Sequence, residues 1–425
     1  MEAARLQAAI RAATAAGWLC PDPLSGDTGA ALVLHDLDLL DAHLDALGAA
    51  FPSSALHAVA VKANPVAGIL DHIAARGFGM EAASAGELAL ALDRTAPGRV
   101  VFDSPCKTWT DLRTALQAGV HLNLDSLQEL LRVETLAQEQ PPTGPVGLRI
   151  NPDVGAGRIA ATSTAVKGSK FGIDLAAHRD AIVAAYARHP WLNALHVHVG
   201  SQGCDLDLLV AGAAAVVDLA ERIEAAGGHV AILDIGGGLP AGYGEDGDPG
   251  PSFEAYAQAL RQARPVLFTD RFRLVTEFGR RVHAAAGLAL ARVEATKVSG
   301  GRRIAVTHLG ADLFVRAVYR PAQWRHRITV HAPDGSLKQG PRMPWDIVGP
   351  LCFSGDRLAK GRQLPALEPG DLVAIHDAGA YTLSMWSRYN SRLAPAVVGL
   401  RGAEPTLSLL KPAETIDDLR RFWGA

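Results

Sequence analysis

The first residue of this chain with the character of a catalytic group is a lysine that follows a short apolar run. Ala58–Val61 reads as a buried strand, and Lys62 comes directly after it, before a turn closed by Asn64-Pro65. An ammonium group at a strand end is partly desolvated, which lowers its pKa and frees the amine as a nucleophile able to form a Schiff base. A lysine there can also extend its head group into water, so the position alone leaves both interpretations open.

A run of three glycines could bind a phosphate. Gly236, Gly237 and Gly238 follow a predicted strand that ends in Asp234-Ile235. Consecutive glycines let backbone N–H groups converge on an anion without obstruction by Cβ atoms, although a plain tight turn has the same composition. The run lacks the GxGxxG spacing of a dinucleotide site, because Pro240 and a Gly/Asp-rich loop follow where a helix should begin.

Two histidines and a serine end another predicted strand. His196 and His198 project to the same face, so a metal site is conceivable. We expect no metal, because no carboxylate or cysteine at suitable spacing completes the ligand set. A histidine stacked on an aromatic ring, with Ser201 donating to an anion, fits an organic cofactor better.

Three further groups complete the candidate site. Glu277 and Arg280 lie in Glu277-Phe278-Gly279-Arg280, and a buried glutamate there could pair with the ring nitrogen of a pyridine cofactor or form an internal salt bridge. Cys352 lies in a Gly/Pro-rich turn that could reach a barrel mouth, although a free cysteine is more often a small buried hydrophobe.

These residues follow apolar strands that alternate with amphipathic helices. The strands are predicted at residues 79–82, 99–102, 121–124, 146–151, 195–199, 232–235 and 273–277, beside 58–61. Helices are predicted from Asp36, Ser84, Thr110, Ser126 and about Leu208. About eight parallel strands with crossover helices imply a (β/α)8 barrel, in which catalytic groups gather at the carboxyl ends of the strands.

Past Arg281 the pattern changes to short alternating segments separated by Gly, Pro and Asp turns, which is typical of an antiparallel β-domain. We expect residues 1–35 to supply a helix and a strand to this domain, residues 36–285 to form the barrel, and residues 286–425 to complete the β-domain.

Composition narrows the class of protein. The 425 residues are 48% hydrophobic and can bury a large core, while the net charge of -3 offers no basic face for nucleic acid. No apolar run is long enough to span a membrane, and residues 1–19 lack a signal-peptide core. The four cysteines are scattered, which favours a reducing compartment, so we expect a cytoplasmic protein.

Together these motifs resemble those of the alanine-racemase-like, fold-type III pyridoxal-phosphate decarboxylases, most closely the diaminopimelate decarboxylase family. The likeness runs from about Ala30 to Pro395, and six separated motifs occur in the family's order. The motifs are Ala60–Asn64, Lys170–Gly172, His198–Ser201, Gly236–Gly238, Glu277–Arg280, and Cys352 with Asp377–Tyr381 and Tyr389–Arg392.

The resemblance implies a role for each matched residue. Lys62 would carry pyridoxal 5'-phosphate as a Schiff base, His198 would stack on its ring, and Glu277 would bond its ring nitrogen. The phosphate would be held by Ser201, Gly236, Gly237, Gly238 and Tyr381, with main-chain groups from Glu277 through Gly279 to Arg280. Cys352 would reach across a homodimer interface to protonate the carbanion left when carbon dioxide departs.

The expected substrate pocket departs from the diaminopimelate pattern. Phe353 occupies the position of a family glutamate that receives the distal ammonium of the substrate, and a benzyl group cannot pair with a cation. Arg280 matches a family arginine for the distal carboxylate. Either Arg316 or Arg320 matches the second, with Arg316 favoured, and Tyr381 is also expected near the substrate.

We therefore expect a decarboxylase of an L-amino acid, or of an amino-acid moiety, that bears a distal acidic group without a neighbouring amine, as in siderophore precursors. One alternative is a diaminopimelate decarboxylase with an altered pocket. Another is a non-catalytic pyridoxal-phosphate carrier, against which the β-domain with Cys352 and Tyr381 argues.

Overall fold

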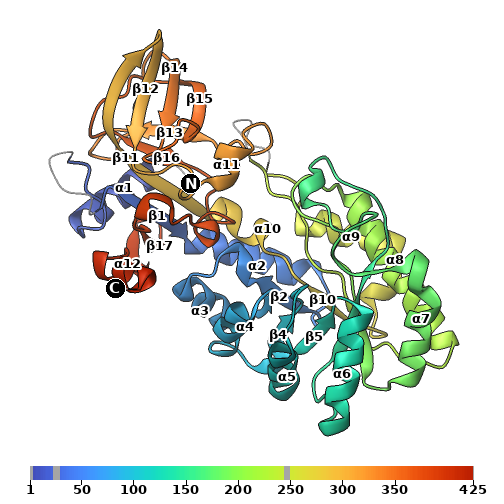
Figure 1. Ribbon diagram of the computed structural model, residues 1–425. Coiled ribbons are helices and arrows are strands. Elements are labelled where there is room, and N and C mark those ends of the chain that lie inside the picture. Colours follow the sequence, from blue (N-terminus) through green and yellow to red (C-terminus); the bar gives the residue numbers. More distant parts are fainter. Residues whose placement is uncertain (1–2, 23–28, 244–248, 425) are drawn as a thin grey trace.

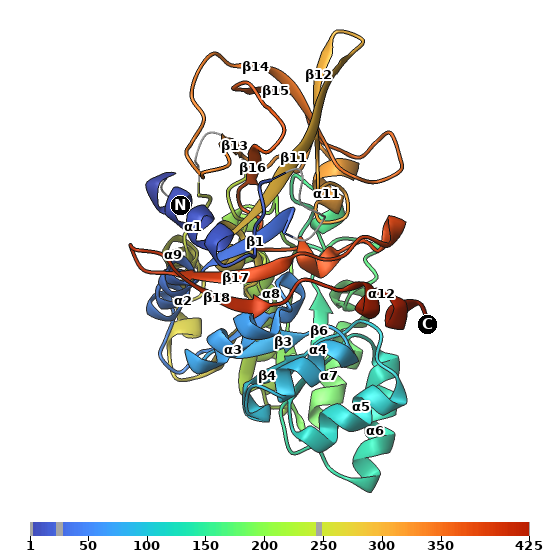
Figure 2. The same ribbon diagram turned by 90° about the vertical axis from the view of Figure 1, so that its left-hand side faces the viewer.

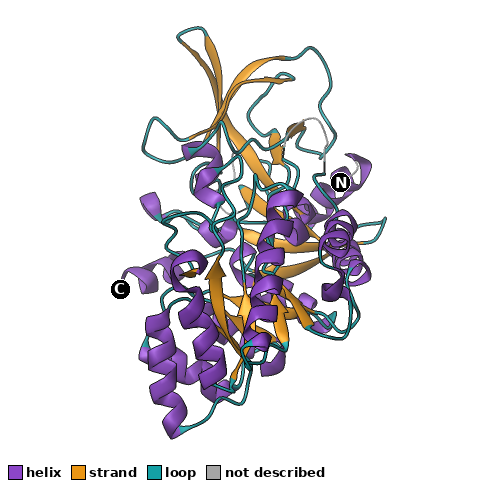
Figure 3. Ribbon diagram, turned by 90° about the vertical axis from the view of Figure 1, so that its right-hand side faces the viewer, coloured by secondary structure: helices purple, strands orange, loops and turns teal. Residues whose placement is uncertain are grey.

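The computed structural model describes residues 3–22, 29–243 and 249–424, which fold into a barrel surrounded by helices and a separate, strongly twisted sheet (Figure 1). Seen from the side, the sheet stands at one end of the barrel, and most of the helices pack around the barrel (Figures 2 and 3).

Eight parallel strands close the barrel. They pair in the order β5-β4-β3-β2-β10-β9-β8-β6, and β6 pairs with β5 to complete the circle. A two-residue strand, β7 (Ile173–Asp174), adds to the side of β6. The barrel strands are β2 (Leu56–Ala60), β3 (Gly79–Ala82), β4 (Val100–Phe102), β5 (His121–Leu124), β6 (Val146–Asn151), β8 (Leu192–His196), β9 (Ile232–Asp234) and β10 (Arg273–Thr276).

Most of the helices that surround the barrel begin at a side chain that caps them, whereas the helix that begins after Val66 has no such cap. Asp36 accepts the Leu39 N–H, and Ser84 and Ser126 accept the N–H groups of Glu87 and Glu129, as the sequence predicts. The helices are α2 (Leu37–Ala50), α3 (Ala67–Ala75), α4 (Ala85–Leu92), α5 (Trp109–Ala118), α6 (Leu127–Glu139), α7 (Leu175–Arg188), α8 (Leu206–Ala225) and α9 (Phe253–Ala263). The predicted barrel is confirmed.

The second sheet combines a strand from before the barrel with strands from after it. Its order is β15-β14-β12-β11-β1-β17-β18, with β16 also on β11 and β13 on β16. The strands are β1 (Ala31–Asp36), β11 (Gly287–Ser299), β12 (Arg302–Thr307), β13 (Ile328–His331), β14 (Met343–Val348), β15 (Arg357–Leu364), β16 (Leu372–Ile375), β17 (Ala396–Arg401) and β18 (Thr406–Lys411).

Most pairs in this sheet are antiparallel, as predicted, but β1 with β17 and β12 with β14 are parallel. The remaining α-helices among the described residues are α1 (Ala3–Ala15), α10 (Arg280–His283), α11 (Val315–Tyr319) and α12 (Ile416–Trp423). The division of the chain at residues 36 and 285 stays a prediction. No helix among the described residues is both long and apolar enough to cross a membrane.

Two histidines meet where the sheet joins the barrel. His35 of β1 and His283 of α10 are fully buried, with ring centroids 5.9 Å apart. Neither ring nitrogen of either residue has a hydrogen-bond partner among the described residues. Burial lowers the pKa of His35 to about 3 and holds that of His283 well below its usual value, so both rings are neutral near pH 7.

Candidate active site

Lys62 lies at the carboxyl end of a barrel strand, where catalytic groups of this fold collect. Strand β2 is buried along its whole length, and Lys62 occupies a single 3₁₀ turn, η1 (Val61–Ala63), directly after it. Its side chain is half-buried and forms an ion pair with Glu81 of β3. A cavity of about 280 Å³ opens beside it, lined by Lys62, Ala83, Asp103, Pro105, Arg149, Thr164, Phe171 and His198.

The charge on Lys62 differs from the sequence-based expectation. Burial opposes the ammonium charge, but the carboxylates of Glu81, Asp103 and Glu277 outweigh it and raise the pKa of Lys62. The predicted lowering of the Lys62 pKa is therefore wrong in the absence of the cofactor. The prediction included the desolvation of the ammonium group but not the acidic side chains that β3 and β4 place beside it.

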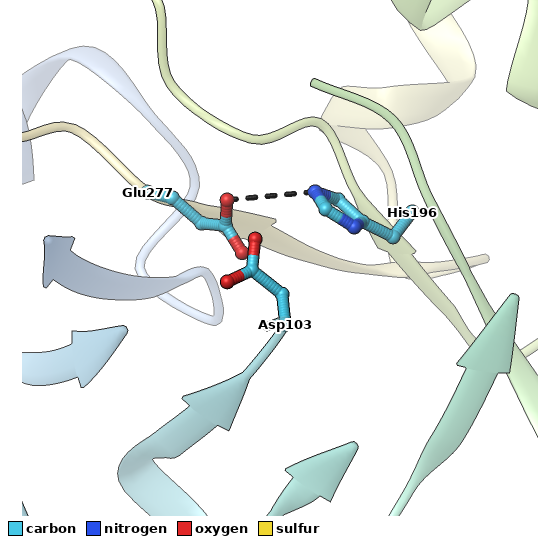
Figure 4. A group of neighbouring side chains, drawn as sticks. All are labelled: Asp103, His196 and Glu277. Carbon is cyan, nitrogen blue, oxygen red and sulfur yellow. Dashed lines mark ion pairs between the residues drawn. The ribbon is translucent and has the colours of Figure 1, made fainter. Parts of the chain in front are cut away.

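Those acids belong to a buried cluster at the carboxyl ends of the strands. Asp103 follows β4, Glu277 follows β10, and His196 ends β8, and Figure 4 shows the three side chains directed toward one another. His196 Nε2 lies 3.4 Å from Glu277 Oε2. Asp234, at the end of β9, accepts a hydrogen bond of 3.0 Å from Asn123 Nδ2.

The buried acids Glu81 and Asp103 have pKa values shifted in opposite directions. Burial and the proximity of Asp103 raise the pKa of Glu81 well above its usual value. Burial also opposes the charge on Asp103, but Lys62 and the neighbouring Glu81 outweigh it and lower the pKa of Asp103. The two acids therefore titrate as a pair beside Lys62, with the negative charge favoured on Asp103.

Glu277 tests whether a pyridine cofactor fits. Its side chain is almost fully buried, and neither carboxylate oxygen makes a well-formed hydrogen bond among the described residues. Burial and Asp103 raise the pKa of Glu277 to about 8 against the opposing effects of Lys62, Asp234 and Arg149, so a further cationic donor would stabilise its charged form. A protonated ring nitrogen entering the adjacent cavity is such a donor, and pyridoxal phosphate therefore fits this site.

His198 is uncharged, which suits stacking of its ring on the ring of a cofactor. Burial, Arg149 and Lys62 hold the pKa of His198 well below its usual value, so its imidazole is neutral. Its Nδ1 accepts the Gly237 N–H at 3.2 Å, and its ring forms part of the cavity wall.

The glycine run is required by close packing. A Cβ on Gly237 would lie 2.4 Å from the Glu277 carbonyl oxygen, and one on Gly238 would lie 2.6 Å from that of Gly200. The N–H groups of Gly236 and Gly237 donate inside the protein, to Asp234 and His198. Binding of a phosphate by this loop stays a prediction.

The donor atoms of Asp103, His196 and Glu277 lie within 4.8 Å of one another, so a metal ion is geometrically conceivable. Lys62, however, already provides a cation for Asp103. The assignment without a metal stays a prediction.

Two arginines share a second, smaller pocket. Arg280 Nη1 donates to the Tyr243 hydroxyl at 3.0 Å, and its Nε and Nη2 donate to Ser201 Oγ at 3.2 Å. Arg316 approaches Arg280 in the same pocket, and the rings of Trp324 and Tyr381 lie 4.4–5.0 Å from the two guanidinium carbons. Among the described residues neither arginine pairs with a carboxylate, and Arg316 Nη1 is buried without a partner.

This pocket distinguishes the two candidate arginines. Arg316 lies in α11 and lines the pocket, whereas Arg320 is exposed just beyond the end of α11 and is not among the lining residues. The backbone holds Tyr381 in place, since its N–H donates to the Ala63 carbonyl at 2.8 Å and its φ is 56°. Gly279 packs so tightly that a Cβ would lie 2.8 Å from that of Ala63.

Cys352 and Phe353 lie apart from this group, on an exposed turn. Cys352 is exposed, and the Phe353 ring stacks on Tyr319 at 5.7 Å and meets the edge of Tyr389 at 6.4 Å. The exposed fractions of Tyr319 and Tyr389 are 63% and 51%. We call Tyr319, Phe353 and Tyr389 the aromatic patch.

Sequence reasoning missed the residues that set the charge around Lys62. Asp103 directly follows a predicted strand, so the rule for barrel strand ends could have found it. Glu81 is a charge inside an otherwise apolar strand, and such a residue is rarely buried without a partner. Trp324 and Tyr243 carry no comparable signal, because only the folded chain brings them to the arginines.

The chain was compared with known proteins. Residues 37–284 match the family model described as pyridoxal-dependent decarboxylase, pyridoxal binding domain. Diaminopimelate decarboxylase of Zymomonas mobilis is 35% identical over 382 residues, covering 88% of this chain and 87% of the relative. That of Pseudomonas fluorescens is 38% identical over 339 residues, covering 78% of each chain.

Solved structures agree. Diaminopimelate decarboxylase of Helicobacter pylori (I148L mutant), complexed with L-lysine, matches with a TM-score of 0.84 and 29% identity, covering 92% of this chain and 96% of that one. The M. jannaschii enzyme in complex with L-lysine matches with a TM-score of 0.83 and 26% identity, covering 97% and 93%. This chain therefore belongs to the pyridoxal-dependent decarboxylases of fold type III, in their diaminopimelate decarboxylase-like group, and is a pyridoxal-phosphate-dependent decarboxylase.

Proposed function

We propose that this enzyme removes the α-carboxylate of an amino acid that carries a second carboxylate at its far end, with diaminopimelate as the first candidate. The observation that carries the proposal is the pair Arg280 and Arg316, which share a pocket without a compensating carboxylate among the described residues. Two unpaired guanidinium groups favour an anionic ligand. The named relatives support diaminopimelate over the specialised-metabolism substrate expected from the sequence.

The cofactor and the side chains of the protein would have different roles in the reaction. Pyridoxal phosphate supplies the electron sink for the electron pair left when carbon dioxide departs. Lys62 would hold it covalently, His198 would pack on its ring, and Glu277 would keep its ring nitrogen protonated. Ser201, the glycine run and Tyr381 would bind its phosphate, while Arg280 and Arg316 orient the substrate through its distal carboxylate.

Cys352 would donate the proton that replaces the lost carboxylate, from the thiol to the α-carbon. Its exposure, and that of the aromatic patch beside it, support a homodimer in which the turn enters the partner's site. The dimer and a cytoplasmic location are parts of the proposal.

A second candidate substrate has the distal carboxylate but lacks the distal amine. The observation that favours it is Phe353, whose ring is held between Tyr319 and Tyr389 and cannot accept a hydrogen bond from an ammonium group. A buried charged donor left unpaired costs at least about 1–3 kcal/mol, or a ten-fold to several-hundred-fold loss of specificity.

The test compares kcat/KM for meso-diaminopimelate and 2-aminopimelate, which lacks the distal amine, in the unmodified enzyme, Phe353→Glu and the uncharged control Phe353→Gln. We expect turnover of diaminopimelate by the unmodified enzyme and a gain of about ten-fold in Phe353→Glu alone. Release of carbon dioxide from 2-aminopimelate but not from diaminopimelate would establish the second candidate. No turnover of any amino acid with a distal carboxylate would refute both.

A further inference from the structure

The backbone of Cys352 is held by two consecutive residues of a distant segment. The Cys352 N–H donates to Asn390 Oδ1 at 2.7 Å, and the Tyr389 hydroxyl donates to the Cys352 carbonyl at 3.3 Å. Both polar backbone groups of the cysteine are thus bonded to the short 3₁₀ segment η7 (Tyr389–Ser391). Tyr389 and Asn390 follow Cys352 in the chain by 37 and 38 residues, so these hydrogen bonds connect distant segments.

Asn390 holds this bond from an uncommon backbone conformation. Its φ is 57° and its ψ is 17°, and Ser391 follows with a φ of 54°. Residues other than glycine seldom adopt this left-handed region, and asparagine is among those that tolerate it best. Two such residues in succession persist only where the surrounding contacts hold them.

Those contacts anchor η7 on both sides. Arg388 forms a two-pronged ion pair with Glu414, at 2.6 and 2.9 Å, and Glu414 Oε2 also accepts the Ala394 N–H at 2.9 Å. The Ser387 N–H donates to the Asp312 carbonyl at 2.9 Å. The segment that carries Asn390 is therefore tied to the C-terminal part of the chain and to the loop before α11.

The opposite end of the cysteine turn is fixed independently. The carboxylate of Asp356 accepts the Leu351 N–H at 2.8 Å and the Ala311 N–H at 2.7 Å. Asp356 thus holds the residue before Cys352, and Asn390 holds Cys352 itself. A cysteine side chain has one rotatable bond before its sulfur, so the backbone and that rotamer together set the position of the thiol.

We propose that Asn390 is a positioning residue for the Cys352 thiol: its side-chain oxygen fixes the Cys352 backbone so that the exposed thiol points in one direction from the turn. The inference rests on the proposed role of Cys352 as proton donor and adds to it the group that aims the donor. A purely structural role for Asn390 predicts lower stability without an effect that depends on the thiol.

The experiment measures turnover and stability in the holoenzyme for four variants. Asn390→Ala removes the bond. Asn390→Gly also removes it but adopts the left-handed conformation without strain, and Asn390→Asp keeps an oxygen acceptor. Asn193→Ala is the matched control, because Asn193 Oδ1 likewise accepts a backbone N–H, from Val146 at 3.3 Å, at the opposite end of the barrel strands.

We expect kcat to fall about ten- to a hundred-fold in Asn390→Ala and Asn390→Gly, the usual effect of a misplaced catalytic group, with little change in KM. Asn390→Asp should recover most of kcat, and Asn193→Ala should keep it. In deuterium oxide, the unmodified enzyme should deliver deuterium to one face of the α-carbon, and Asn390→Ala and Asn390→Gly should lose part of that selectivity.

A double variant with Cys352→Ala distinguishes the role of Asn390 as a positioning residue from the role of Cys352 as proton donor. If Asn390 acts through the thiol, adding Asn390→Ala to Cys352→Ala should cause no further loss of kcat. If Cys352→Ala is impaired and the double variant loses kcat by the product of the two single losses, the two residues act independently. That result would overturn the positioning role of Asn390 but not the proposed role of Cys352. Full turnover by Cys352→Ala would overturn the proposed proton donor and the inference with it.

Discussion

The surroundings of Lys62 and of Cys352 differ in burial and in the charge of the neighbouring groups. Lys62 faces a cluster of buried carboxylates supplied by the ends of four barrel strands, among them Glu81 and Glu277. Cys352 lies on an exposed turn of the β-domain beside the half-exposed rings of the aromatic patch. The buried groups around Lys62 all come from the same chain, whereas the surroundings of Cys352 are open on one side.

This difference indicates which features of the site belong to the subunit and which require a second copy. A buried charge must be satisfied where the chain folds, because an unpaired one is costly. An exposed thiol beside exposed aromatic rings carries no such requirement, and its surroundings can be completed by another surface. We therefore expect cofactor attachment to depend on one subunit and turnover to depend on two.

Loss of Lys62 should have the largest effect. Lys62→Ala should abolish decarboxylation, because no other amine lies at the mouth of the cavity, among its lining residues, to hold the cofactor. In the unmodified enzyme, borohydride should fix a pyridoxyl group on Lys62, detectable by peptide mass. Lys107→Ala serves as a control for the modification site, since Lys107 is buried against Glu129. Labelling of another lysine would contradict the assignment.

Loss of Cys352 should have a smaller effect that leaves the buried site intact. Cys352→Ala should lower kcat about 10²-fold, the typical contribution of a positioned acid, while borohydride still fixes the cofactor on Lys62. Cys106→Ala, which replaces another exposed cysteine, is the control. Unchanged turnover would make Cys352 an ordinary surface residue.

A mixture of Lys62→Ala and Cys352→Ala would test the comparison directly. Both variants alone are impaired, but a mixed dimer should contain one site with its own lysine and the partner's thiol. We expect activity to reappear when the two proteins are mixed and allowed to exchange subunits. If activity does not return although mixed dimers form, the two residues do not meet across an interface.

Changes at His35 and His283, where the sheet joins the barrel, should have the smallest effect on turnover. His35 and His283 stay neutral in the folded chain, because burial lowers the pKa of His35 to about 3 from the ordinary 6.5. The unfolded chain takes up protons below pH 6.5, so stability should decrease as the pH falls from 6.5 toward 3. Each histidine contributes up to about 1.4 kcal/mol per pH unit.

His283→Phe should weaken this dependence. The ring is kept, the unpaired nitrogens are removed, and one titrating group is lost. We expect the fall in Tm between pH 7.5 and pH 5 to become smaller, with kcat little changed at pH 7.5. The exposed His178, replaced by Gln, is the control. An unchanged pH dependence in His283→Phe would show that the pair does not govern acid stability.

The barrel could be predicted because its strands and caps are local features. Residues 79–82, 121–124 and 146–151 match β3, β5 and β6 at every position. The second sheet was harder: alternating segments are readable at residues 289–296, 303–306, 327–331, 372–376 and 406–410, but β14, β15 and β17 lie outside them. β14 contains Pro344 and β15 contains Gly361 and three cationic residues, so their sequences do not alternate clearly. The parallel pairing of β1 with β17 depends on contacts across most of the chain.

In the candidate site, too, local motifs could be predicted from the sequence and contacts between distant segments could not. Each motif at a strand end could be read from the sequence, and the fold brings Lys62, His198 and Glu277 to the same region. The charge on Lys62 was not predicted, because it depends on Glu81 and Asp103, which belong to none of the motifs although each lies in or directly after a predicted strand. The choice between Arg316 and Arg320 likewise required α11, a helix of five residues that turns the first toward the pocket and leaves the second exposed.

The placement of β1 has a consequence for how the protein is made. Leu32 pairs with Leu290 on one side and with Ala396 on the other, so both neighbours of this strand emerge from the ribosome long after it. The intervening barrel can form while β1 still has two open edges, and unpaired apolar strands are sites of aggregation. Synthesis of β17, rather than barrel closure, is thus the step that completes the pairing of β1, and truncation before β17 should leave a chain dependent on chaperones.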